Sequence, residues 1–422
     1  MDAERYLVIS SDCHAGLPNA DYREWLDPEY RPAFDDYLAE RAKLLQLAQR
    51  GMLNESFAEE WERDNEEGLR GGWDAARRDK ELDADGVAGE VIFPDADAVT
   101  AGASAPFGAG LAAGGDTDPT LLMAGARAHN RWLAELCATS PERRAGVAIV
   151  PIYDVDAAVA EIRRARESGL RGGILIPSMW QPYPPYHHPR YEPVWATCAE
   201  LKMPVHVHSG SADKESYGPH VGIYVTEVRW WSSRPLWFLI WSGVFDRHPD
   251  LRFVVTECGA FWAADLLWMM DTAYDREHGS RKLGDQLTAN LSRRPSEVFD
   301  AQCGIGASNT RRRELARRYE IGVGNIMWGN DFPHPEGTWP HTREWLAEAF
   351  HDVPVDETRV ILGGAAAEMY GFDTEALGRL AARIGPTPAD LGQVDAAGVP
   401  TADAARWADL KAAGRPWLTG AD

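Results

Sequence analysis

Asp12 and His14 follow a short apolar run, Tyr6–Ile9, close to the N-terminus. The run predicts a buried strand, and residues i and i+2 of an extended strand point to the same side. A carboxylate and an imidazole would then face one point, which is an arrangement that divalent metals use. A strand followed by a polar turn would have the same pattern, so the motif alone leaves both interpretations open.

Three further apolar runs end in residues of the same kinds. One carries His206 and His208, the next reaches Glu257, and the last is followed by Asp331 and His334. Each has an ordinary explanation: an ion pair for Glu257, a turn cap for Asp331, a core position for His206 and loop ordering for His334. Four such groups at equivalent places nevertheless predict one shared site.

Apolar runs alternate with helical patterns along the chain and predict the scaffold. We expect strands at 6–9, 86–94, 146–151, 172–177, 203–208, 251–257, 298–303 and 325–331, with helices at 119–140, 155–168, 191–201 and 230–245. Eight strands separated by helices predict an α/β fold, a parallel (β/α)8 barrel whose strand carboxyl ends share one face. An open doubly wound sheet competes, but no glycine-rich phosphate turn follows the first strand.

The predicted barrel domain covers residues 1–370. A charged helical insertion occupies about 21–80, and 371–422 reads as a C-terminal helical tail rich in Ala, Gly, Pro and Asp. Both the insertion and the tail could serve a dimer contact, so a homodimer is one expectation.

The composition restricts the partners. Of 422 residues, 65 are acidic and 43 are basic, which gives a formal charge of −22 and disfavours nucleic acid and anionic membranes. We find no signal peptide pattern and no long apolar run, so a cytoplasmic enzyme of small molecules is expected. Five cysteines without a CxxC pair indicate reduced thiols.

Three motifs carry a family resemblance: SDCH at 11–14, PVHVH at 204–208 and GNDFPHPE at 329–336. In these motifs the chain resembles the metal-dependent "amidohydrolase 2" group. The resemblance spans about residues 6 to 370. That group includes the aminocarboxymuconate semialdehyde and resorcylate decarboxylases. The resemblance implies that His14, His208 and Asp331 bind the metal.

Two positions depart from the better-known members of that group. The opening pair is Asp12-x-His14 in place of His-x-His, and Glu257 stands where the decarboxylases have a histidine that handles protons. With Asp331 this makes three carboxylates, so one divalent ion would leave a ligand shell of −1 and two would leave +1. Carboxylates also suit metals harder than zinc. We therefore expect two Fe ions, with Zn or Mn as the alternative.

The leading hypothesis is a diiron monooxygenase, since the sequence is also similar to the amidohydrolase-fold non-haem diiron monooxygenases of platensimycin and platencin biosynthesis. Dioxygen would hydroxylate a bulky, diterpenoid-like substrate walled by the tryptophan-rich segment 230–241. The expected metal ligands are Asp12, His14, His206, His208, Glu257 and Asp331, and the expected catalytic residues are Glu257, Asp331 and His334.

The alternative hypothesis is a mononuclear hydrolase or a non-oxidative decarboxylase of a small carboxylated substrate. One metal would lower the pKa of a bound water to about 7, and Asp331 or Glu257 would move the proton.

Overall fold

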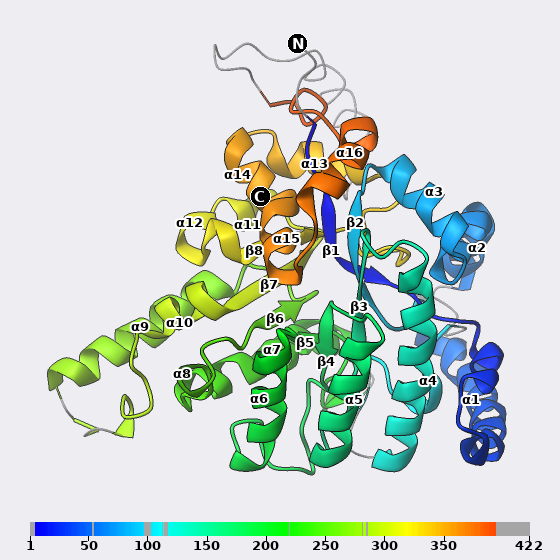
Figure 1. Cartoon of the computed structure of the whole chain (residues 1–422), viewed down its shortest axis with the longest axis horizontal. Helices are drawn as coiled ribbons and strands as arrows, with labels where there is room; N and C mark the ends of the chain where they lie inside the picture. The colour runs from blue at the N-terminus through cyan, green and yellow to red at the C-terminus, as the bar shows by residue number, and fades with distance from the viewer. Residues whose placement is uncertain are drawn as a thin grey trace.

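Eight parallel strands form one sheet, ordered β1 to β8, in a computed structural model of the chain (Figure 1). The structure describes residues 5–52, 55–96, 103–111, 113, 117–218, 220–280, 282–283 and 286–393. The strands are β1 (Ile9–His14), β2 (Gly89–Phe93), β3 (Arg144–Ile149), β4 (Gly173–Leu175), β5 (Val205–His208), β6 (Phe253–Thr256), β7 (Cys303–Ser308) and β8 (Ile326–Gly329). The predicted (β/α)8 barrel is confirmed.

Backbone hydrogen bonds join the first strand to the segment that follows the last one. The Asp331 amide donates to the Asp12 carbonyl over 2.8 Å, and the His14 amide donates to the Phe332 carbonyl over 2.7 Å. Cys13 and Phe332 form a parallel bridge between them. The barrel therefore closes where the sequence places its opening and final metal-type motifs.

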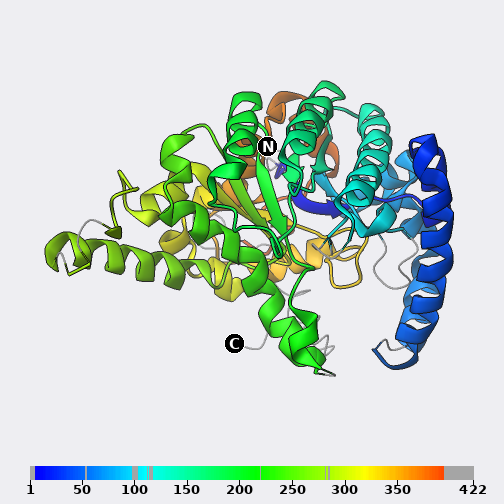
Figure 2. The ribbon, with the colours of Figure 1, turned by 90° about the horizontal axis from the view of Figure 1, so that it is seen from below.

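Helices surround the strands (Figures 1 and 2). Their bounds are α1 (Arg31–Met52), α2 (Glu55–Leu69), α3 (Ala75–Asp85), α4 (Pro119–Ala138), α5 (Val155–Glu167), α6 (Glu192–Leu201), α7 (Val221–Trp241), α8 (Val244–Arg247), α9 (Ala263–Ser280), α10 (Pro295–Gln302), α11 (Arg312–Leu315), α12 (Arg318–Ile321), α13 (Thr342–Phe350), α14 (Val355–Arg359), α15 (Ala365–Tyr370) and α16 (Thr374–Ile384). Within the described residues, no helix is both long and apolar enough to cross a membrane.

The seventh strand lies later in the chain than predicted. The segment Pro295–Gln302 forms helix α10, and β7 begins only at Cys303. Val298 and Phe299 are the buried face of this helix, and a short apolar run does not distinguish a strand from a buried helix. The true strand, CGIGAS, is too rich in small residues to show a strand pattern.

The first strand also extends further than predicted. The apolar run Tyr6–Ile9 only leads into β1, which continues to His14 and is buried throughout. The polar residues Ser10, Ser11 and Asp12 therefore lie inside the strand, with a register irregularity against β2 between Ser10 and Cys13. Asp12 and His14 reach the barrel mouth from the strand itself, not from a turn after it.

The predicted insertion is helical and lies at one side of the barrel, where α1 and α2 stand apart from the strands in both views (Figures 1 and 2). The described part of the predicted tail contains α16, and the Tyr6 amide donates to the carbonyl of Pro386 just beyond that helix. Residues 394–422 of the tail lie outside the described part of the chain.

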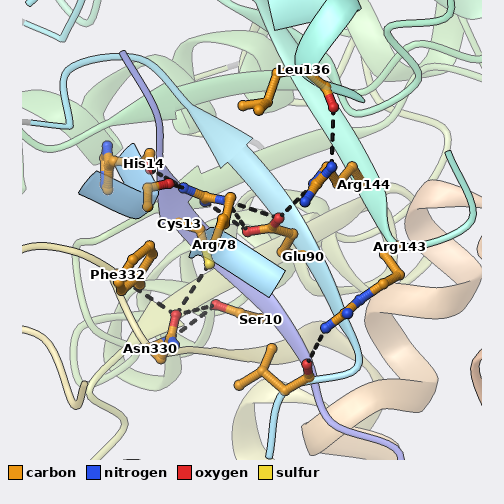
Figure 3. Close-up of polar contacts among 12 residues, drawn as sticks. Ser10, Cys13, His14, Arg78, Glu90, Leu136, Arg143, Arg144, Asn330 and Phe332 are labelled. Carbon is orange, nitrogen blue, oxygen red and sulfur yellow. Dashed lines mark hydrogen bonds and ion pairs between the residues drawn. The ribbon is translucent and has the colours of Figure 1, made fainter. Parts of the chain in front are cut away.

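Arg78 on α3 links this insertion to the first two strands (Figure 3). Its guanidinium lies 2.7 Å from the Glu90 carboxylate on β2 and donates to the His14 carbonyl over 2.8 Å. Arg144 on β3 approaches Glu90 to 3.4 Å. Burial opposes ionisation of Glu90, but the two arginines outweigh it and hold its pKa below the usual range. This ion network fixes the carboxyl end of β1.

Replacing Arg78 tests that network. Arg78→Met leaves the buried Glu90 carboxylate with a weaker partner, so we expect the free energy of unfolding to fall by about 3 to 5 kcal/mol. Urea unfolding measures the loss. The control is Arg77→Met on the same helix, whose partners Glu67 and Glu81 lie nearer the surface and whose loss should be much smaller. Equal losses for both variants would contradict a structural role for the network.

Candidate metal centre

The ends of β1, β5 and β8 bring Asp12, His14, His208 and Asp331 together. The Asp12 Oδ1 atom lies 3.2 Å from His208 Nε2 and 3.4 Å from His14 Nε2. The Asp331 Oδ1 atom lies 3.1 Å from His14 Nε2. Three segments far apart in the sequence thus present two carboxylates and two imidazoles to one another.

Both imidazoles are oriented by backbone carbonyls. His14 Nδ1 lies 2.7 Å from the Pro94 carbonyl oxygen, and His208 Nδ1 lies 2.8 Å from the Ser209 carbonyl oxygen. In each ring Nδ1 donates to that carbonyl, so Nε2 faces the cluster and would offer its lone pair to a metal once it has lost its proton. Metal-binding histidines are commonly held in this way.

The cluster is short of partners for its buried polar atoms. Asp12, His14 and Asp331 are fully buried and His208 is 1% exposed. Among the described residues, His14 Nε2 and both carboxylate oxygens of Asp331 make no hydrogen bond of good geometry, although Asp331 Oδ1 lies within ion-pair distance of His14 and His334. Buried polar atoms without partners are rare, and a cation would satisfy all three atoms. Two carboxylates with two neutral imidazoles carry −2, which one divalent ion neutralises.

The pKa shifts report the same shortage of positive charge. Burial lowers the pKa of His14, but the carboxylates of Asp12 and Asp331 outweigh it and raise that pKa well above its usual value. Burial opposes ionisation of Asp12, yet His208 and His14 hold its pKa below the usual range. Protons on the histidines balance the carboxylates, and a bound metal would displace those protons.

Two carboxylate residues of the site have a left-handed backbone. Asp331 has a φ of 58° and Glu257 a φ of 55°, a conformation that costs free energy in residues other than glycine. Asp331 lies two residues after β8, and Glu257 directly follows β6. Such strain concentrates at functional sites, where the surrounding structure holds it in place.

His334 lies beside the cluster as a cation. Its Nδ1 atom is 2.9 Å from Asp331 Oδ1, its Nε2 atom is 2.9 Å from the Asp95 carbonyl oxygen, and its ring stacks on His14 at 4.0 Å. Both nitrogens face acceptors, so both carry protons. Burial and His14 lower the pKa of His334, but Asp331 outweighs them and raises it to about 9.

Glu257 approaches the cluster from the other side of His208. Its Oε2 atom lies 3.3 Å from His208 Nδ1, not from the Nε2 atom that faces Asp12. Two groups of candidate metal ligands occur among the described residues, Asp12 with His14 and His208, and His14 with Asp331 and His334; neither includes Glu257. Burial first and the Asp331 charge second raise the pKa of Glu257 to about 7.

His206 faces away from the cluster. Of its two expected roles, the geometry favours a hydrogen-bonded core histidine over a metal ligand. Its Nε2 atom lies 3.0 Å from the Gly172 carbonyl oxygen, its Nδ1 atom lies 3.4 Å from the Thr256 hydroxyl, and its ring stacks on Tyr370. Burial lowers its pKa to about 3. His206 is therefore neutral, and the carbonyl of Gly172 occupies the nitrogen that a ligand would need.

Ser308 is a site residue that sequence reasoning missed. It ends β7, and its hydroxyl donates a hydrogen bond to Asp12 Oδ2. The seventh strand was predicted to end at Cys303, which would put Ser308 in a loop. Ser308 was therefore not considered as a site residue. The remaining signal was its position in a serine-asparagine-threonine segment after a glycine-rich run, which is too common a pattern to single it out.

A cavity of about 700 Å³ adjoins the cluster, and Glu257 and Ser308 are part of its wall. The tryptophan-rich segment walls an adjoining groove of about 460 Å³, which Trp230, Trp237 and Trp241 line together with residues of α9 and which shares Arg229 and Phe261 with the cavity. Its volume is that of an ordinary small-molecule pocket, and so is that of the cavity beside Glu257. The expected tryptophan wall is therefore not the wall of the cavity next to the cluster.

A parallel α/β barrel with histidines and aspartates gathered at its strand carboxyl ends is an architecture of metal-dependent enzymes. Comparison with known families agrees, since the Amidohydrolase family model matches residues 11–372. The chain belongs to the amidohydrolase family.

Several relatives are decarboxylases. The chain is 30% identical over 245 residues to gamma-resorcylate decarboxylase of Rhodococcus jostii (strain RHA1). The alignment covers 53% of this chain and 70% of the relative. It is 27% identical over 242 residues to the same enzyme of Rhizobium sp. (strain MTP-10005), covering 52% and 68%.

Solved structures share the fold. A 5-carboxyvanillate decarboxylase of Novosphingobium aromaticivorans with bound manganese matches with a TM-score of 0.64 and 18% identity, over 87% of this chain and 96% of that one. A dihydroxybenzoic acid decarboxylase of Polaromonas sp. JS666, also with bound manganese, matches with a TM-score of 0.59 and 18% identity, over 87% and 97%.

The two histidines of β5 give a matched test of the cluster. His208→Gln should abolish metal binding, because it removes a nitrogen aimed at Asp12. His206→Gln should keep it, because that nitrogen faces a backbone carbonyl. Titration calorimetry with Mn²⁺ on the folded, metal-stripped proteins measures both. Metal lost from the His206 variant and kept by the His208 variant would reverse the assignment.

Proposed function

We propose that this enzyme is a metal-dependent, non-oxidative decarboxylase of an aromatic carboxylic acid. One observation carries the proposal: a buried cluster of two carboxylates and two imidazoles, with Asp331 and His14 atoms that lack hydrogen bonds of good geometry, lies beside a cavity lined by a protonatable glutamate. The gamma-resorcylate decarboxylases among the relatives support the same reaction. They favour the decarboxylase alternative over the expected monooxygenase, because their reaction removes a carboxylate without oxidation.

We propose one divalent ion, manganese or zinc, in place of the expected two irons. The count of three ligand carboxylates favoured two ions, but Glu257 contacts the Nδ1 side of His208, so two carboxylates remain in the cluster. Asp12, His14, His208 and Asp331 would hold the ion. When bound, it would attract and orient the carboxylate or hydroxyl oxygens of the substrate.

Glu257 is the proposed proton donor to carbon. Its side chain is 22% exposed and lines the cavity, and its raised pKa of about 7 keeps much of it protonated near neutral pH. Its proton would form the new C–H bond at the ring carbon that bears the carboxylate. The bond from that carbon to the carboxylate then breaks, its electron pair returns to the ring, and CO2 leaves. The balance requires no oxidant.

His334 would keep Asp331 ionised during this reaction. Its positive charge lies 2.9 Å from the Asp331 carboxylate, and the Asp95 carbonyl fixes its ring. Asp331 is then the more strongly stabilised carboxylate of the site, while Glu257 is the one that retains a proton. Two carboxyl groups whose environments separate their pKa values are suited to different roles.

Gas exchange separates the two functions. With Mn²⁺ present and 2,6-dihydroxybenzoate as the probe, we expect CO2 release at the same rate under argon and in air, with no oxygen uptake at the electrode. The product should be resorcinol, one molecule for each CO2. Oxygen consumption coupled to substrate loss, or a reaction that stops under argon, would contradict the decarboxylase.

Substitution of the proposed acid gives a second test. Glu257→Gln keeps the size of the side chain but removes its proton, so we expect kcat to fall by about 10² to 10⁴-fold with Mn²⁺ binding retained. Glu375→Gln on the exposed face of α16 is the control and should leave kcat unchanged. Near-normal turnover in the Glu257 variant would remove it from the chemistry.

A further inference from the structure

The cavity beside the cluster is rich in arginines. Arg229, Arg311, Arg313 and Arg317 all line it, together with Glu257 and Ser308 on the side of the cluster. Arg317 is neutralised, because its guanidinium lies 2.8 Å from Asp265 and 2.9 Å from Glu320. The other three arginines have no ion pair to any described residue.

Unpaired arginines are unexpected in this chain. It has 65 acidic and only 43 basic residues, so carboxylate partners are plentiful. Arg312 illustrates this, since it stands between Arg311 and Arg313 and pairs with Asp352 over 2.6 Å outside the cavity. Three arginines without carboxylate partners among the described residues thus gather at the cavity that adjoins the cluster.

Most carboxylates of the cavity wall contact groups other than these three arginines. Asp265 pairs with Arg317, and the buried Glu314 accepts hydrogen bonds from the backbone amides of Ala260, Phe261 and Arg311. Glu257 faces His208. Of the described acidic wall residues, only Glu336 has none of these contacts, and no ion pair joins it to Arg229, Arg311 or Arg313.

An aromatic face accompanies these arginines. Phe261 is 47% exposed although it is a large apolar residue, and the Arg229 guanidinium lies over its ring at 5.7 Å. Phe261 and Arg229 line the cavity together. An exposed ring beside an unpaired cation provides a stacking surface and a charge for a planar acid.

We propose that the substrate is an aromatic acid with a second carboxylate, which Arg229 and Arg311 bind in this cavity. The inference rests on the proposed function, in which the first carboxylate is lost at the cluster. The second carboxylate is not consumed, and its role is to select and orient the substrate. Arg229 and Arg311 are therefore specificity residues.

Binding of inert acids tests the subsite without turnover. Titration calorimetry of the Mn²⁺-loaded enzyme compares benzoate with isophthalate and terephthalate at low ionic strength. We expect the better dicarboxylate to bind about tenfold more tightly than benzoate, because each arginine adds a charge-assisted hydrogen bond that is partly exposed to solvent. The preference should shrink as salt is added.

The double variant Arg229→Gln and Arg311→Gln should bring the dicarboxylate and benzoate affinities to within about twofold of each other. Both side chains are exposed, so the variant should unfold at the same temperature as the wild type. The control Arg312→Gln should keep the full preference.

Equal binding of benzoate and both dicarboxylates by the wild type would overturn the proposal, and so would a preference that survives in the double variant. These results are distinct from failure of the proposed function. That failure would appear as no CO2 release from any aromatic acid, whatever the binding preference.

Discussion

Two carboxylates buried at the mouth of the barrel impose the main constraint on this structure. Asp12 and Asp331 are fully inaccessible to solvent, and burying a charge without a compensating cation costs several kcal/mol per ion. In the chain itself, protons on His14, His208 and His334 provide the compensation. A divalent ion would do the same and release the histidine protons, so the site is built to exchange protons for a metal.

The neighbouring structure holds this costly arrangement in place. The barrel closes through the backbones of Asp12 and Asp331, so any opening between β1 and β8 separates the two carboxylates. Asn330 reinforces the closure by accepting from the hydroxyl of Ser10, and Arg78 ties the His14 carbonyl to the insertion (Figure 3). The insertion therefore contributes to the site through Arg78.

The sequence predicted the barrel and the members of the cluster because both leave local patterns. Apolar runs mark most of the strands, and His or Asp directly after such a run falls at the barrel mouth. Contacts across the barrel leave no such pattern. The hydrogen bond from Ser308 to Asp12 depends on a strand of small residues, and the side of His208 that Glu257 approaches depends on a left-handed backbone.

In the proposed function, the side of His208 that Glu257 approaches separates the decarboxylase from the oxygenase. With Glu257 counted as a ligand, three carboxylates require two ions and suggest oxygen activation. With Glu257 behind His208, two carboxylates match one ion, and the third carboxyl group keeps a proton at the cavity wall. We therefore propose a different reaction for the same residue types on the basis of their geometry.

The most direct test is anomalous diffraction from crystals of the full chain soaked in Mn²⁺. The account predicts one strong peak bounded by Asp12, His14, His208 and Asp331, with no second peak at Glu257. Two peaks of similar height, one of them bound by Glu257, would contradict it, as would the absence of any peak at the four-residue cluster.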